Sequence, residues 1–246
     1  IRQITVSQGN IQLHTDTNGL TNYDFWEASP SKESENFKLV LQKLVFQNST
    51  LSYADLRTEV NWEAQIKKSV LSGNFTNKDF LLNVKASMIS EKLMLQETTL
   101  IRPIPIDIDF SLFVEHFRSF QFKKGALKSG NQLLDVSGVI HKLTDGTHLD
   151  LDLASRQIVI HDFLELLPDN WKKWVEGYNA KGFLEIEAKI NGMLSDKSSP
   201  LIESSFHLSK GEFVDSQTGL KLSETMLKGF FTNGINQSTT TSQLSL

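Results

Sequence analysis

Apolar and polar side chains alternate with a period of two along several stretches of this chain. In one of them, Leu149, Leu151 and Leu153 are separated by Asp150 and Asp152. The same alternation occurs in residues 82–88, 104–110 and 184–190. Because successive side chains of a β-strand point to opposite faces, each stretch predicts a strand with one apolar and one polar face. Such strands are typical of antiparallel sheets, so we expect an all-β, mainly antiparallel fold.

Turn sequences separate the alternating stretches. They are Asn18-Gly19, Asp145-Gly146, Asn191-Gly192, Thr218-Gly219 and Asn233-Gly234. Asn-Gly and Asp-Gly pairs supply the positive φ angles that tight hairpins require. Their spacing predicts a long, curved or meandering sheet, or a groove, of about ten or more strands.

A weak motif, apolar-x-apolar-x-x-small-x-apolar, occurs four times. Its copies begin at Ile4, Leu44, Phe120 and Phe206. We interpret each copy as a strand, a two-residue reversal and the start of the next strand. The irregular spacing leaves two explanations open, a true repeat or four hairpins of one kind.

Residues 162–178 depart from the strand pattern. Phe163, Leu166 and Leu167 have helical spacing, Asp162 is placed to cap them, and Pro168 ends the turn. A second short helix would carry Trp171, Trp174 and Val175. We therefore expect one short helical insertion, whose tryptophans either pack on the sheet or contact a ligand.

Composition narrows the possible functions. The net charge is −4 without a concentrated basic patch, so nothing favours nucleic-acid binding. The absence of cysteine excludes disulfides and thiolate sites, and fits an extracytoplasmic compartment. We expect a single elongated domain over residues 1–246, with a soft boundary near 195–200. Because both ends fall inside strand-like patterns, we expect a segment of a longer protein.

Candidate chemistry is sparse. His148, Asp150 and Asp152 lie on one strand face, where residues roughly 6.5 Å apart can share a metal, but the polar face of an amphipathic strand explains them as well. Glu185 and Glu187 also have two explanations: they form a catalytic acid/base pair, or they belong to a solvated strand face. No nucleophile-elbow, metalloprotease, phosphate-loop or dinucleotide motif occurs. We expect no enzyme, no catalytic residue, no metal and no cofactor.

The apolar strand faces are the remaining candidate site. One helical segment is too little to cover so long a sheet, so the sheet either folds into a sandwich or leaves a groove for an apolar ligand. The residues that we expect to contact lipid are Leu149, Leu151, Leu153, Leu184, Ile186, Ile190, Phe206 and Leu208. Alternation alone selects them, and a closed sandwich core is the other explanation.

Three segments resemble AsmA-like envelope proteins. Residues 1–26 carry an x-x-G-x-I element followed by D-x-x-G-x-x-N-aromatic, in which the matching positions are Gly9, Ile11, Asp16, Gly19, Asn22, Tyr23 and Phe25. Residues 39–53 are similar to the next strand pair of that family. Residues 149–234 are similar to its strand pair, Leu-Leu-Pro helix and following strands. The resemblance covers both ends of the chain well and the middle loosely.

The resemblance implies a non-enzymatic protein of lipid transport and outer-membrane assembly or homeostasis. Such proteins are anchored in the inner membrane by an N-terminal helix, lie mostly in the periplasm, and resemble TamB-like proteins whose β-groove carries acyl chains. The implied partner is a phospholipid or other lipid, with envelope assembly proteins as further partners, and the anchor would lie outside this segment. Two alternatives remain: a periplasmic scaffold or protein-interaction domain, and a carbohydrate-active β-sandwich enzyme.

Overall fold

A computed structural model describes residues 2–23, 41–75, 78–95, 98–166, 172–173, 175–234, 236 and 241–245. The predicted all-β class is confirmed, because 74% of the chain is in strands, one large and mostly antiparallel sheet contains them, and the described residues hold little helix beside α1. In chain order the elements are β1 (Gln3–Ser7), β2 (Asn10–Thr15), β3 (Lys43–Asp55), β4 (Val60–Ser72), β5 (Asp79–Leu95), β6 (Thr98–Glu115), β7 (Ser119–Ser129), β8 (Gln132–Leu143), β9 (Gly146–Val159), α1 (Ile160–Leu166), β10 (Tyr178–Leu194), β11 (Leu201–Asp215), β12 (Lys221–Thr232) and β13 (Gln243–Ser245).

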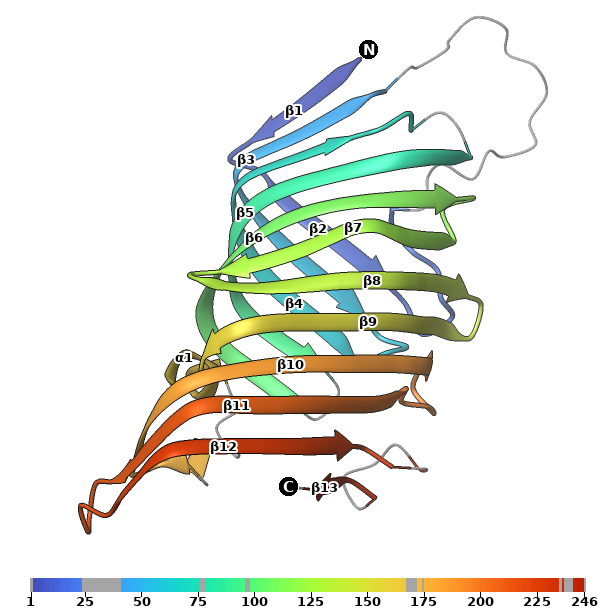
Figure 1. Ribbon diagram of the computed structural model, residues 1–246. Helices are drawn as coiled ribbons and strands as arrows, with labels where there is room; N and C mark the ends of the chain where they lie inside the picture. The colour runs from blue at the N-terminus through green and yellow to red at the C-terminus, as the bar shows by residue number, and fades with distance from the viewer. Residues whose placement is uncertain are drawn as a thin grey trace, which may run out of the picture.

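The sheet is a meander of 13 strands. From β3 to β13 each strand pairs antiparallel with the next, whereas β1 and β2 both lie parallel to β3. The sheet is open, with β1 and β2 at one edge and β13 at the other. Figure 1 shows β3 to β6 bending along their length, so that one half of each strand crosses behind β7 to β10.

The four copies of the apolar-small motif do not reverse the chain, so the hairpin interpretation was wrong, and the copies at Phe120 and Phe206 coincide with register shifts. The copies at Leu44, Phe120 and Phe206 each lie inside one continuous strand. Asn48 and Lys210 have left-handed φ angles of 47° and 52°, just before the small residue. A single left-handed residue displaces one pleat and bends the strand without turning the chain back. The first copy is similar, because Gln8, with φ 56°, separates β1 from β2.

Three of the five predicted turns lie outside the strands, after β2, between β11 and β12, and after β12, and a fourth, Asp145-Gly146, falls at the β8–β9 turn with Gly146 as the first residue of β9. The fifth prediction, Asn191-Gly192, was wrong, because both residues lie within β10. Asn191 pairs with Asp150 on β9 and with Leu201 on β11. A turn here would remove backbone hydrogen bonds on both sides, so the sheet overrides the local preference.

The D-x-x-G-x-x-N-aromatic segment folds the chain back onto β2. The Asp16 carboxylate accepts hydrogen bonds from the backbone N–H groups of Asn18 and Leu20, each at 2.8 Å. The Asn22 side chain accepts from the His14 N–H and donates to the Gln12 carbonyl. The polar residues of this motif therefore hold a turn, and Phe25 lies outside the described residues.

The helical insertion is confirmed by α1, near the predicted position, and residues 172–173 and 175 of the predicted second helix are also helical. It begins at Ile160, so Asp162 lies in its first turn and is not the N-cap. The side chains of Phe163 and Leu164 pack against the buried cluster that includes Leu184. Trp171 and Trp174 lie outside the described residues.

Three buried clusters hold the sheet together, and each joins neighbouring strands. The first centres on Phe80, Leu112 and Val114 and extends from β3 to β7. The second joins α1 to β9–β12, and the third joins β2–β6 around Ile66 and Met88. The stretch between β7 and β9 thus connects two separately packed ends. The predicted boundary at 195–200 coincides with the connection from β10 to β11.

Gly138 allows us to test the packing of the central strands. It has a φ of 113°, and an added Cβ would collide with the backbone oxygen of Asp150 on β9. Gly130, in the β7–β8 turn, has a φ of 58° and open space around it. We expect Gly130→Ala to cost about 1–2 kcal/mol of unfolding free energy from backbone strain alone. Gly138→Ala should cost about 1–3 kcal/mol more, from the added overpacking.

Urea unfolding of the two variants, followed by circular dichroism, measures this difference. Equal losses would mean that β8 and β9 are not as closely paired as the structure has them.

Candidate functional site

One face of the sheet is apolar across almost its whole width. Cross-strand register places Met88 of β5 opposite Ile106 of β6, and Val136 of β8 opposite Leu153 of β9. Further along, Leu151 of β9 lies opposite Ile190 of β10. Because facing residues in a ladder point to the same side, these side chains form one continuous surface, which we call the apolar face.

All eight residues expected to contact lipid lie on the apolar face. They are Leu149, Leu151 and Leu153 on β9, Leu184, Ile186 and Ile190 on β10, and Phe206 and Leu208 on β11. The register places Ile186 opposite Phe206, and Leu184 opposite Leu208. The structure therefore brings together the set that alternation selected, and their contact with lipid stays a prediction.

Burial divides the eight into two groups. Leu184 and Leu208 are buried, with 6% and 2% of their surface exposed, in the cluster beside α1. Ile186 and Phe206 pack against that cluster. The other four, Leu149, Leu151, Leu153 and Ile190, are half-buried and belong to none of the three clusters. We call these four residues the central stripe.

The opposite face, the outer face, is polar. Lys124 contacts Asp109 at 2.6 Å across β6 and β7, and Lys221 contacts Glu212 at 3.0 Å across β11 and β12. The hydrogen bond from Lys124 holds the pKa of Asp109 below its usual value. Opposite charges facing each other across strands favour a solvated face. The outer face therefore has no need of a second layer, and the apolar face is the one that needs a cover.

Little of the described structure covers the apolar face. The sheet is open. Among the described elements, the helix α1 packs mainly against β9 and β10.

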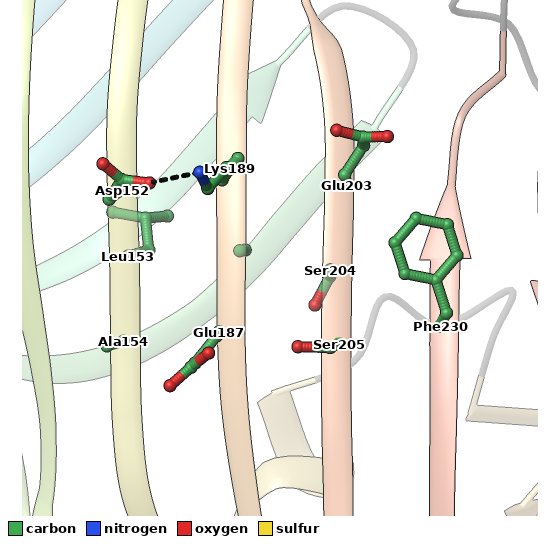
Figure 2. Close-up of a pocket in the computed structure, with 10 residues that line it drawn as sticks. Asp152, Leu153, Ala154, Glu187, Lys189, Glu203, Ser204, Ser205 and Phe230 are labelled. Atoms are coloured by element: carbon green, nitrogen blue, oxygen red, sulfur yellow. Dashed lines mark ion pairs between the residues drawn. The ribbon is translucent and has the colours of Figure 1, made fainter.

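A shallow pocket of about 310 Å³ lies on the outer face (Figure 2). The short side chains of Ala154 and Ser205 form its floor, with the longer Glu187 and Glu203 beside them. Asp152 pairs with Lys189 at 3.8 Å, the dashed contact in Figure 2. These carboxylates are exposed to water on a flat strand surface.

The other polar candidates also have partners on this face. Asp150 accepts a hydrogen bond from Asn191, and Glu185 lies 3.9 Å from His207. Among the residues that the structure describes, no three His, Asp or Glu side chains gather closely enough to hold a metal ion.

Sequence reasoning missed a polar contact between two distant turns. Arg57, in the β3–β4 turn, donates from Nη1 to the backbone carbonyls of Leu143 and Thr144 in the β8–β9 turn, each at 3.3 Å. Its side chain is 11% exposed and pairs with Asp55 at 3.4 Å. Burial raises the pKa of the nearby Tyr53 hydroxyl strongly, with further contributions from Tyr23 and Asp55. No periodicity marks this contact, because it joins residues 86 and 87 positions apart.

Comparison of the chain with protein-family models, with curated proteins and with solved structures finds no match. In the part of the chain that the structure describes, no helix combines the length and the apolar character needed to cross a membrane.

The two burial groups predict different costs of truncation. Leu208→Ala should lower the unfolding free energy by about 2–5 kcal/mol, because it leaves a cavity inside a buried cluster. Leu151→Ala should cost about 1 kcal/mol, because the side chain is already in contact with solvent on one side. Chemical denaturation of both variants checks this. A Leu151→Ala cost as large as that of Leu208→Ala would identify the central stripe as an ordinary closed core.

Proposed function

We propose that the apolar face binds lipid acyl chains and that the chain is a non-enzymatic segment of a lipid-transport protein of the bacterial envelope. The observation that carries this proposal is the central stripe, an apolar surface that lies between two buried clusters and belongs to neither. A surface of this kind on a soluble protein usually has a ligand or a partner.

The dimensions and the chemistry of the stripe suit hydrocarbon. The stripe lies on two neighbouring strands, β9 and β10, about 4.8 Å apart, and its three β9 residues extend it along the strand. Leu149, Leu151 and Leu153 contribute branched apolar side chains to it, and the charged residues between them point to the outer face. Each methylene group buried on such a surface contributes about 0.8 kcal/mol. A lipid tail needs no polar recognition, which fits the lack of polar groups among these residues.

The resemblance to AsmA-like proteins suggests where in the cell this activity takes place. The fold class itself was predicted from the alternation of apolar and polar residues, and the resemblance adds the cellular setting. On that basis we propose a periplasmic location, an inner-membrane anchor outside this segment, and a role in outer-membrane lipid homeostasis.

A scaffold function is the second candidate, and β12 favours it. Leu222 and Met226 expose 57% and 76% of their surface. β13 pairs only with residues Phe230 to Thr232, so the rest of this edge of β12 has no strand partner among the described residues. An exposed edge with apolar side chains can accept a strand from an envelope assembly protein.

Native mass spectrometry with lipid extraction tests the first proposal. The protein, purified from a bacterial periplasm, should carry phospholipid at substoichiometric or stoichiometric levels. The double variant Leu151→Asp/Ile186→Asp should lose it, because a carboxylate on the apolar face disfavours contact with hydrocarbon. Circular dichroism confirms that the variant is folded.

The matched control is Leu133→Asp/Ile89→Asp, which introduces the same charges at exposed positions of the outer face. This control should keep its lipid. A folded wild-type protein free of lipid would contradict acyl-chain binding and favour the scaffold function. Equal lipid loss in both double variants would show that added charge, and not its position, is responsible.

A further inference from the structure

A second cavity, of about 630 Å³, lies where four turns meet. Asn18 to Thr21 contribute from the turn after β2, His116 to Arg118 from the β6–β7 turn, and His141 to Thr144 from the end of β8 and its turn. Arg57 completes the lining. We call this space the turn cavity.

The lining of the turn cavity is cationic. Arg57, Arg118 and Lys142 carry permanent positive charge, and His116 and His141 lie beside them. Among the described residues that line the cavity there is no Asp or Glu. Asp55, which pairs with Arg57, and Asp79, which pairs with His116, both lie outside the lining. Three permanent positive charges therefore share this cavity.

Two of these cations are held in place by their neighbours, and Arg57 also pairs with Asp55. Lys142 Nζ lies 4.7 Å from the Tyr23 ring centroid and 5.8 Å from that of Phe120, and pairs with no carboxylate among the described residues. Arg57 is fixed by the carbonyls of the β8–β9 turn, and its buried Nε has no hydrogen-bond partner among the described residues.

The floor of the turn cavity joins the apolar core. Phe117 lines the cavity and its ring lies 5.4 Å from that of Phe80, in the cluster with Leu112 and Val114. Phe120, beneath Lys142, packs against the same cluster. A cationic rim next to an apolar floor matches an amphiphile with an anionic head.

We propose that the turn cavity binds a phosphate ester, with the phosphate between Arg57, Arg118 and Lys142. Arginine and lysine are the side chains that recognise phosphate through charge-assisted hydrogen bonds. This inference rests on the proposed function for one point, that the ester is the head of a phospholipid whose acyl chains reach the apolar side. The anion site itself does not depend on the central stripe.

Isothermal titration with two soluble probes tests the site on the full chain. One probe is glycerol 3-phosphate, which is a headgroup alone, and the other is dihexanoyl-phosphatidylglycerol below its micelle concentration. Wild-type protein should bind both, and the lipid at least about 10 times more tightly if its tails are buried against Phe117. Arg118→Gln/Lys142→Gln should weaken both affinities by about 10-fold or more, as expected when two phosphate contacts are lost.

Lys124→Gln, on the outer face, is the matched control and should bind like wild type. Lys142→Arg keeps the charge and should retain binding, which separates loss of charge from loss of folding. Unchanged affinity in the Gln double variant, or no binding of either probe to wild type, would overturn the inference. Equal affinity for both probes would identify a free phosphate ester and overturn the lipid source. Loss of lipid in Leu151→Asp/Ile186→Asp with glycerol 3-phosphate binding intact would leave the proposed function and the anion site separately supported.

Discussion

The structure depends on apolar side chains that face each other across neighbouring strands on one side of a single sheet. Pairs such as Leu184 with Leu208, and Val136 with Leu153, repeat from β3 to β12 on the same face. The outer face carries ion pairs between neighbouring strands and stays solvated. A one-sided sheet must cover its apolar side, and among the described elements the helix α1 packs mainly against β9 and β10. The bend of β3 to β6 and the Arg57 contact bring the β3–β4 and β8–β9 turns together. The turn cavity lies where these turns meet.

The strands could be predicted from the sequence because a period of two is a local property. The alternation around Leu151, Ile186 and Ile106 was enough to define their strands and to place the eight candidate residues on one face. The bulges could not be distinguished from turns, because a left-handed residue followed by a small one suits both. Only the neighbouring strand decides, as it does for Asn191-Gly192 inside β10. The Arg57 contact and the turn cavity depend on how distant turns meet, and no local pattern encodes that.

On the apolar face, the degree of burial distinguishes the residues that stabilise the fold from those that could contact a ligand. Residue type does not distinguish them. Leu184 and Leu208 are as apolar as Leu151, but they are enclosed beside α1 and hold β9 to β11 together. The central stripe lies beyond that cluster and keeps part of its surface exposed. With the turn cavity at another part of the sheet, the molecule offers an apolar surface and a cationic cavity that both adjoin its packed clusters. Together these features suit a molecule that is apolar along most of its length and anionic at one end.

The most direct test of the account is methyl NMR with a paramagnetic fatty acid, in which the nitroxide broadens signals of nearby methyl groups. The account predicts selective broadening of Leu149, Leu151 and Ile190 on the apolar face, while Leu133 and Ile89 on the outer face stay sharp. It also predicts that an unlabelled phospholipid competes the effect away. Equal broadening of both faces, or none on the apolar face of a folded protein, would contradict the claim that this sheet offers its apolar side to lipid.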